Sequence, residues 1–178
     1  MRRYISLGIL ATLMPTILLA DKQDNPVPEI IPKSNIIKCK YYEKNVNTVI
    51  DFENAVLNVI FNKGSVDEVS KYLGKTYIQH YPSAEDGPDG LITYLKGLGD
   101  KKVFTRVETR KIFACNDYVI LENIFYSSKN DLGTAAINTF RVKDGKIIEH
   151  WELMEPIPKE AKNNNGIFWL FPINCVNS

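Results

Sequence analysis

The sequence predicts a single α+β domain, in which three N-terminal helices pack on a curved antiparallel sheet. Apolar residues recur at helical spacing up to about Leu98, and four runs rich in β-forming residues follow between Val103 and Met154. Helices followed by consecutive strands with short turns are typical of an α+β fold. The length agrees, because 178 residues hold one domain with a real core but not two.

The N-terminus predicts export. Arg2 and Arg3 precede an uncharged, mostly apolar run from Tyr4 to Ala20, which is the layout of a secretory signal peptide. We expect residues 1–20 to be cleaved after Ala20, with an uncleaved membrane anchor as the alternative. Residues 21–44, which contain three prolines, form a linker and N-terminal arm. The mature protein is thus expected to be secreted or periplasmic and free of the membrane.

The first helix is predicted over about Asn45 to Asn62, with Gly64 as its stop. Ser65 with Glu68 three residues later fits a capping box and predicts a short second helix that ends near Leu73.

The region between the second helix and the sheet predicts two further elements. Thr76 to Pro82 is rich in β-formers and indicates a short strand or an extended arm. The apolar spacing from Leu91 to Leu98 predicts the third helix, with Gly97 and Gly99 near its end. The meander that follows is predicted over four ranges, which are Val103–Ala114, Tyr118–Ser127, Thr134–Val142 and Ile147–Met154.

Charge and motifs exclude several function classes. Lys and Arg number 22 against 21 Asp and Glu, and no basic cluster interleaved with aromatic residues occurs, so a nucleic-acid partner is not expected. The sequence has no nucleophile elbow, phosphate-binding glycine loop or dinucleotide motif. Neither histidine lies near a pair of cysteines, so no zinc site is expected.

The three cysteines are Cys39, Cys115 and Cys175, so at most one disulfide can close within the chain. A bridge between Cys39 and Cys175 would join the N-terminal arm to the C-terminal tail. Three independent thiols are the alternative, and Cys115 is expected to be a packed thiol at a strand end.

The last hairpin determines which side chains share a face of the sheet. The sequence Lys143-Asp144-Gly145 predicts a three-residue loop with a bulge at Gly145, which pairs Phe140 with Ile148 and Asn138 with His150. A two-residue turn at Asp144-Gly145 would instead place His150 beside Thr139. In the preferred register the inward face carries Asn138, Phe140, Ile148, His150, Glu152 and Met154.

Two titratable side chains of this hairpin are candidates for chemistry. His150 and Glu152 lie two residues apart and so project from one face, among apolar neighbours. Such a pair can be tuned toward neutral pH for proton transfer. The alternative is a histidine that donates to a backbone carbonyl and a glutamate at a solvated sheet end. His80, beside Tyr77 and Gln79, lies either at a pocket mouth or in an ordinary surface loop.

Three blocks together resemble the SnoaL-like polyketide cyclase group of the nuclear transport factor two-like superfamily. They are YIQHYPSAEDGPDGL (77–91), NTFRVKDGKIIEHWELMEPIP (138–158) and NNNGIF (163–168). The resemblance implies a cone-shaped domain, here over 45–168, whose bent sheet and helices surround an apolar cavity. It also implies that His80, His150 and Glu152 line this cavity. In the cyclases an acidic residue moves the protons of an intramolecular aldol condensation without metal or cofactor.

Two functions are compatible with these observations. The first is a cofactor-independent lyase or isomerase acting on a small carbonyl compound. In it His150 and Glu152 move protons, His80 orients the substrate, and the substrate-binding residues are Gln79, Tyr77, Asn138, Phe140 and Met154. The second is a non-catalytic protein that binds an apolar small molecule. The resemblance further implies a homodimer formed through the sheet, and the apolar extension at 169–178 would cover that interface or pack onto the sheet.

Overall fold

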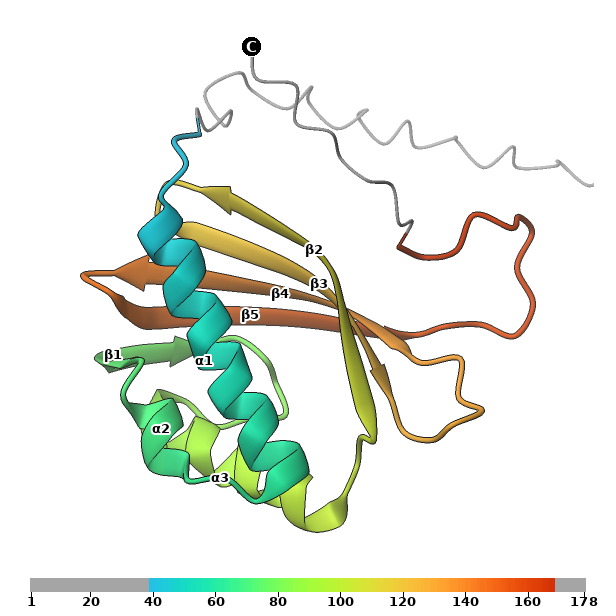
Figure 1. Cartoon of the computed structure of the whole chain (residues 1–178), viewed down its shortest axis with the longest axis horizontal. Coiled ribbons are helices and arrows are strands. Elements are labelled where there is room, and N and C mark those ends of the chain that lie inside the picture. The colour runs from blue at the N-terminus through green and yellow to red at the C-terminus, as the bar shows by residue number, and fades with distance from the viewer. Residues whose placement is uncertain (1–38, 169–178) are drawn as a thin grey trace, which may run out of the picture. The chain divides into compact units, whose positions relative to one another are not determined.

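The computed structural model describes residues 39–168 of the chain. The expected signal peptide, most of the N-terminal arm, Cys175 and the extension at 169–178 lie outside the described residues. The elements, in chain order, are α1 (Glu43–Asn62), α2 (Val66–Ser70), β1 (Leu73–Gln79), α3 (Gly87–Lys101), β2 (Arg106–Cys115), β3 (Tyr118–Tyr126), β4 (Thr134–Lys143) and β5 (Lys146–Pro156) (Figure 1). The predicted α+β fold with three helices and a curved sheet is confirmed.

The helices begin and end where local backbone groups find partners. At the end of α1, Lys63 adopts a left-handed conformation (φ 56°) and the Gly64 N–H donates to the Asn58 carbonyl at 3.0 Å. The hydroxyl of Ser65 accepts from the Asp67 N–H at 3.1 Å, which confirms it as the N-cap of α2.

Helix α3 is longer than predicted, because the two glycines near its expected end lie inside it. A Cβ atom on Gly99 would lie 3.0 Å from the carbonyl oxygen of Val59 on α1. The glycine therefore permits the two helices to approach closely, and the helix continues to Lys101.

The sheet has the strand order β1-β5-β4-β3-β2. Strands β2 to β5 form the predicted antiparallel meander, whereas β1 pairs in parallel with β5. The sheet is therefore mixed rather than wholly antiparallel. Strand β1 comes before the meander in the chain and adds to the meander at its β5 edge. The predicted strand or arm at Thr76–Pro82 coincides with this edge strand only up to Gln79, because β1 begins at Leu73 and residues 80–82 follow its end.

The register of the last hairpin differs from both sequence-based alternatives. Asp144 and Gly145 both have positive φ (53° and 72°), which makes a two-residue turn rather than the predicted three-residue loop. An irregularity then leaves Ile148 as an extra residue, because Val142 pairs with Ile147 and Arg141 with Glu149.

The extra residue shifts the pairing of β4 with β5 by one position. His150 therefore lies on the predicted inward face, although the turn and the bulge differ from the predicted ones. Phe140 is opposite His150 and Asn138 is opposite Glu152, so the predicted pairings are wrong although the shared face is right. Ile147 replaces Ile148 in the core and is fully buried. Ile148 packs over Gly74, where a Cβ atom would lie only 2.9 Å from its Cγ2.

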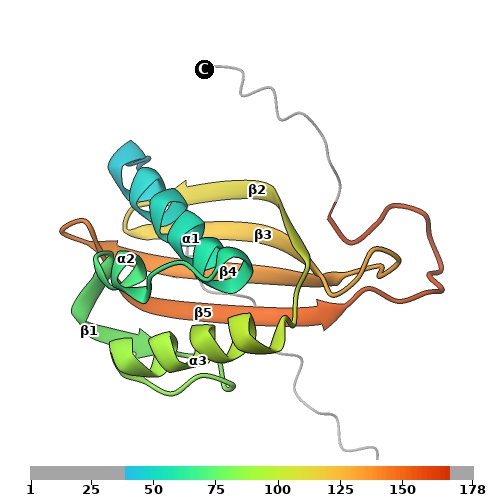
Figure 2. The ribbon, with the colours of Figure 1, turned by 60° about the horizontal axis from the view of Figure 1, so that its bottom comes forward.

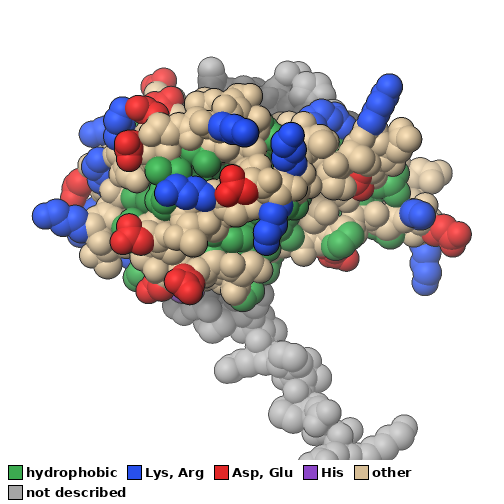
Figure 3. Space-filling view, turned by 90° about the horizontal axis from the view of Figure 1, so that it is seen from below, with side chains coloured by type: hydrophobic (Ala, Val, Ile, Leu, Met, Phe, Trp, Pro, Cys, Tyr) green, Lys and Arg blue, Asp and Glu red, His purple; other side chains and the backbone are tan. Residues whose placement is uncertain are grey.

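All three helices lie on one face of the sheet. Helix α1 crosses the strands, and α3 runs along the side formed by β1 and β5 (Figures 1 and 2). The core between them is made chiefly of aliphatic residues, with Val49, Val69, Val119 and Phe140 almost fully buried. On the face that Figure 3 shows, acidic and basic side chains are interspersed with apolar ones.

The disulfide prediction is wrong in its pairing. Cys39 is bonded to Cys115, not to Cys175, and it joins the segment before α1 to the end of β2. Two hydrogen bonds reinforce this junction, since Asn116 donates to the Lys40 carbonyl at 2.8 Å and accepts from the Lys40 N–H at 3.1 Å. Within residues 39–168, no helix is both long and apolar enough to cross a membrane.

Candidate active site

A pocket opens between α1, α3 and the inward face of the sheet. Water-sized molecules can place their centres in about 60 Å³ of it, within about 610 Å³ of space that is free of protein atoms and includes open solvent. Most of its wall is apolar, and the polar side chains that reach it are Glu53, Gln79, Tyr81, Tyr94, Asn138, His150 and Glu152. Among the lining residues within the described part of the chain there is no Lys or Arg. An apolar pocket with a few convergent polar groups is typical of a small-molecule site.

His150 is held between two side-chain amides. Its Nε2 lies 2.9 Å from Oδ1 of Asn138, and its Nδ1 lies 3.2 Å from Oε1 of Gln79. One face of its ring stacks on Phe140, with centroids 4.6 Å apart. Burial, with a smaller contribution from the charge of His80, lowers the pKa of His150 to about 3. His150 is therefore a neutral imidazole at physiological pH, and each of its ring nitrogens lies near a side-chain oxygen.

Glu152 lies next to His150 on the same face of β5 and lines the pocket. Burial raises its pKa to about 7, and the neighbouring Asn138 amide opposes this shift by favouring the carboxylate. Asn138 is itself 4% exposed, and its Nδ2 makes no hydrogen bond of good geometry. A carboxyl group with this pKa exchanges protons readily near pH 7.

The sequence interpretation missed the second carboxyl group of the pocket, Glu53 on α1. Burial, and secondarily the negative charge of Glu152, raises the pKa of Glu53 to about 8. The Glu53 side chain is half-buried: it is exposed only toward the pocket that it lines, and protein atoms surround the rest of it. A signal was present in the sequence: the residues three, four and seven positions to either side are all apolar, namely Val46, Val49, Ile50, Val56, Leu57 and Ile60.

Two tyrosines complete the polar part of the wall. Their rings meet edge to face, with centroids 5.8 Å apart, and the Tyr81 hydroxyl donates to Sδ of Met154 at 3.6 Å. Burial is the main cause that raises the pKa of Tyr94. The Tyr94 hydroxyl thus stays protonated and can donate to a ligand.

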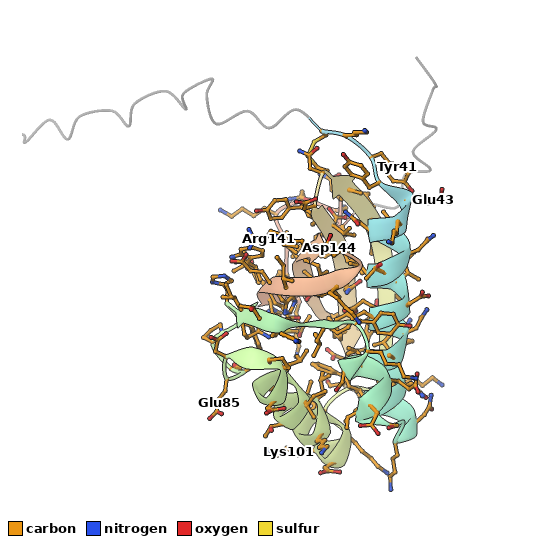
Figure 4. All side chains as sticks on the ribbon, turned by 90° about the vertical axis from the view of Figure 1, so that its left-hand side faces the viewer. Tyr41, Glu43, Glu85, Lys101, Arg141 and Asp144 are labelled. Atoms are coloured by element: carbon orange, nitrogen blue, oxygen red, sulfur yellow. A yellow bond between two sulfur atoms is a disulfide. The ribbon has the colours of Figure 1, made fainter. Side chains whose placement is uncertain are left out.

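His80 does not line the pocket, contrary to what the resemblance implied. Gln79 is paired with His150 and faces inward, so the next residue faces the other side of the sheet. There the His80 ring stacks on Trp151 with centroids 4.7 Å apart, and its Nε2 lies 2.9 Å from Glu149. Arg141, which also pairs with Glu149, lies on this side, away from α1 (Figure 4).

The other predicted residues are placed as follows. Gln79, Asn138, Phe140, His150, Glu152 and Met154 line the pocket together. Tyr77 is 2% exposed and belongs to the core rather than to the pocket wall. Its hydroxyl accepts a hydrogen bond from Nε2 of Gln79 at 3.0 Å, so Tyr77 contacts the pocket-lining Gln79 without lining the pocket itself. Among residues 39–168, no group of three or more His, Cys, Asp or Glu side chains is arranged to hold a metal ion.

Comparison with known families agrees with this geometry. The family model of the SnoaL-like domain matches residues 55–150, which is more than half of the chain. The chain belongs to the SnoaL-like family. Among curated proteins no match was found.

Solved structures similar to this SnoaL-like chain share its fold at low sequence identity. One is a steroid delta-isomerase from Pseudomonas aeruginosa (TM-score 0.51, 14% identity, 67% of this chain and 85% of that one). Another is a nuclear transport factor two-like protein of unknown function from Cytophaga hutchinsonii (TM-score 0.51, 17% identity, 66% and 95%). A third is a de novo designed protein with a curved β-sheet (TM-score 0.53, 20% identity, 66% and 89%).

Proposed function

We propose that this SnoaL-like protein catalyses proton transfer at the carbon next to a carbonyl group of a small, largely apolar substrate. The observation that carries the proposal is the presence of two carboxyl groups, Glu53 and Glu152, with raised and different pKa values in one apolar pocket. Environments that separate the pKa values of two such groups assign one as base and the other as acid.

Glu152 has the lower pKa of the two and ionises first, so it is the base. Its carboxylate would take a proton from the α-carbon, while the carbonyl oxygen gains negative charge. Glu53, which is largely protonated at pH 7, would donate a hydrogen bond to that oxygen. Return of a proton from Glu152 to a different carbon of the enolate completes an isomerisation, with atoms and charge balanced. When the proton on Glu152 exchanges with solvent before it returns to the enolate, the substrate takes up label from D₂O.

His150 has a positioning role in this proposal, not the proton-transfer role expected from the sequence. With its pKa near 3 it is a weak base at pH 7, and Gln79 and Asn138 lie against its two ring nitrogens. Its neutral ring holds Oδ1 of Asn138, whose amide in turn acts on the Glu152 carboxyl group.

Deuterium incorporation tests the proposal. The protein is incubated in D₂O with apolar ketones, including a β,γ-unsaturated cyclic ketone, and products are followed by mass spectrometry. We expect enzyme-dependent exchange at the α-carbon, with a loss of about a hundredfold or more in Glu152→Gln. The matched control is Glu155→Gln, an exposed carboxyl group on the same strand, which should retain the activity.

The second candidate is a non-catalytic carrier, which the mostly apolar wall of the pocket favours. Binding of these ketones with no exchange above the uncatalysed rate would replace the enzyme by the carrier. We also propose that the protein acts outside the cytoplasm, with which the Cys39–Cys115 disulfide is compatible. Cell fractionation tests this, and recovery in the cytoplasm with both thiols reduced would contradict it.

A further inference from the structure

The side-chain amide of Gln79 has only one orientation that satisfies its neighbours. Its Oε1 accepts from the backbone N–H of Tyr81 at 3.0 Å, and its Nε2 donates to the Tyr77 hydroxyl at 3.0 Å. A backbone N–H can only donate, so the reversed amide would place two donors against each other. Oε1 of Gln79 is therefore a fixed acceptor facing Nδ1 of His150.

This acceptor restricts the proton of His150. A neutral imidazole has one N–H and one lone pair. With the proton on Nδ1, the ring donates to Gln79, and Nε2 becomes an acceptor that requires the nitrogen of the Asn138 amide. With the proton on Nε2, the ring donates to Oδ1 of Asn138 as the structure places it, but its Nδ1 lone pair faces the oxygen of Gln79.

The two arrangements differ in what Asn138 presents to Glu152, its cross-strand partner. As placed, Nδ2 lies toward the Glu152 side and favours the carboxylate. After a half-turn of the amide, Nδ2 would donate to Nε2 of His150 and Oδ1 would face Glu152. Oδ1 then needs a donor, which Glu152 supplies only when it is protonated. That arrangement satisfies every member of the network and gives Nδ2 a hydrogen bond of good geometry, which it lacks as placed.

We propose that Gln79 is a positioning residue which, through the proton position of His150 and the amide orientation of Asn138, favours the protonated form of Glu152. The inference rests on the proposed role of Glu152 and goes beyond it by naming what sets the pH at which the site has a base. When Glu152 releases its proton to solvent, the Asn138 amide turns and the single proton of His150 moves from Nδ1 to Nε2. The cost of this change is the lone-pair contact with Gln79, which raises the proton affinity of Glu152.

Other titratable groups act on the same site and must be separated from this effect. Glu53 on α1, Tyr94 on α3 and Tyr77 on β1 interact electrostatically with Glu152, and His80 acts on His150. All four remain when Gln79 is changed to methionine, which keeps the length of the side chain and removes the acceptor. The difference in the titration midpoint of Glu152 between wild type and Gln79→Met therefore measures the contribution of the Gln79 amide.

The test is an NMR titration of ¹³C-labelled Glu152 together with the ¹⁵N shifts of His150. In Gln79→Met we expect the midpoint of Glu152 to fall by about one pH unit, a tenfold loss of proton affinity. The matched control is Tyr77→Phe, in which the Tyr81 N–H still holds Oε1 of Gln79. Burial raises the pKa of Tyr77, so its hydroxyl carries no charge near pH 7 and its loss should leave the midpoint unchanged. In the wild type, the His150 proton should lie on Nδ1 below the Glu152 midpoint and on Nε2 above it.

The outcomes separate the inference from the function on which it rests. A His150 proton on the same nitrogen throughout the titration overturns the inference, whether or not Gln79→Met folds. A raised Glu152 midpoint that does not move in Gln79→Met also overturns it and leaves the proposed function standing. A wild-type midpoint near 4.5 would overturn both, because Glu152 would then lack the property that both require.

Discussion

Replacement of Glu53 by glutamine is expected to stabilise the protein increasingly as the pH rises, while activity falls. Glu53 ionises at about pH 4.5 in the unfolded chain and at about pH 8 in the folded one. Below pH 4.5 the group is protonated in both states and does not lower the free energy of unfolding. Between these two values only the unfolded chain releases the proton, so the folded state loses stability as the pH rises.

The magnitude follows from the difference in pKa. Each unit corresponds to about 1.4 kcal/mol, so the cost reaches about 3 kcal/mol at pH 7 and about 5 kcal/mol above pH 8, as upper bounds. Glutamine has nearly the same shape and no charge, so Glu53→Gln removes this cost. The expected gain is near zero at pH 4.5 and a few kcal/mol at pH 8.5.

Urea denaturation of both proteins at pH 4.5, 7 and 8.5, with the disulfide intact, measures the gain. Asp51→Asn is the control, because Asp51 is exposed on the same helix and its replacement should give no such trend. An equal stability difference at all three pH values, or a variant less stable than wild type at pH 8.5, would refute the reasoning.

Two further changes test the packing around the site. Reduction of the Cys39–Cys115 bridge, which spans 76 residues, should lower the free energy of unfolding by about 4 kcal/mol, as read from urea curves with and without reductant, and no change would contradict the bond. Phe140→Ala should cost about 3–5 kcal/mol and raise the mobility of the His150 ring, because Phe140 is 1% exposed, meets Phe52 edge to face and stacks on His150. A thermal-unfolding curve that matches wild type would contradict this account of the core.

The parts of the structure that depend on local patterns were predictable from the sequence. The period of apolar residues placed α1, and the turn residues placed the four strands of the meander. The inward face of β5 was also predicted, although its register was not. The bulge at Ile148 depends on the space over Gly74 in a neighbouring strand, which no turn motif reveals.

The features that depend on distant contacts were missed or misplaced. Cys39 meets Cys115 because the segment before α1 lies at the end of β2, a proximity set by the fold. The resemblance implies that His80 lines the cavity, but side chains alternate along the extended chain after β1, so His80 lies on the outer face of the sheet. Glu53 lies within the apolar stripe of α1, and a single acidic residue in an amphipathic helix is ordinarily solvent-exposed, so the local pattern does not reveal its burial.

The most direct test of the central claim is a ¹³C NMR titration of the glutamate carboxyl carbons of the folded protein, assigned with Glu53→Gln and Glu152→Gln. The account predicts midpoints near pH 8 for Glu53 and near pH 7 for Glu152. It also predicts that the midpoint of Glu53 falls when Glu152 is replaced, because the repulsion between the two charges is removed. Two independent midpoints near pH 4.5 would contradict it, since the pocket would then hold two ordinary solvated carboxylates and no acid–base pair.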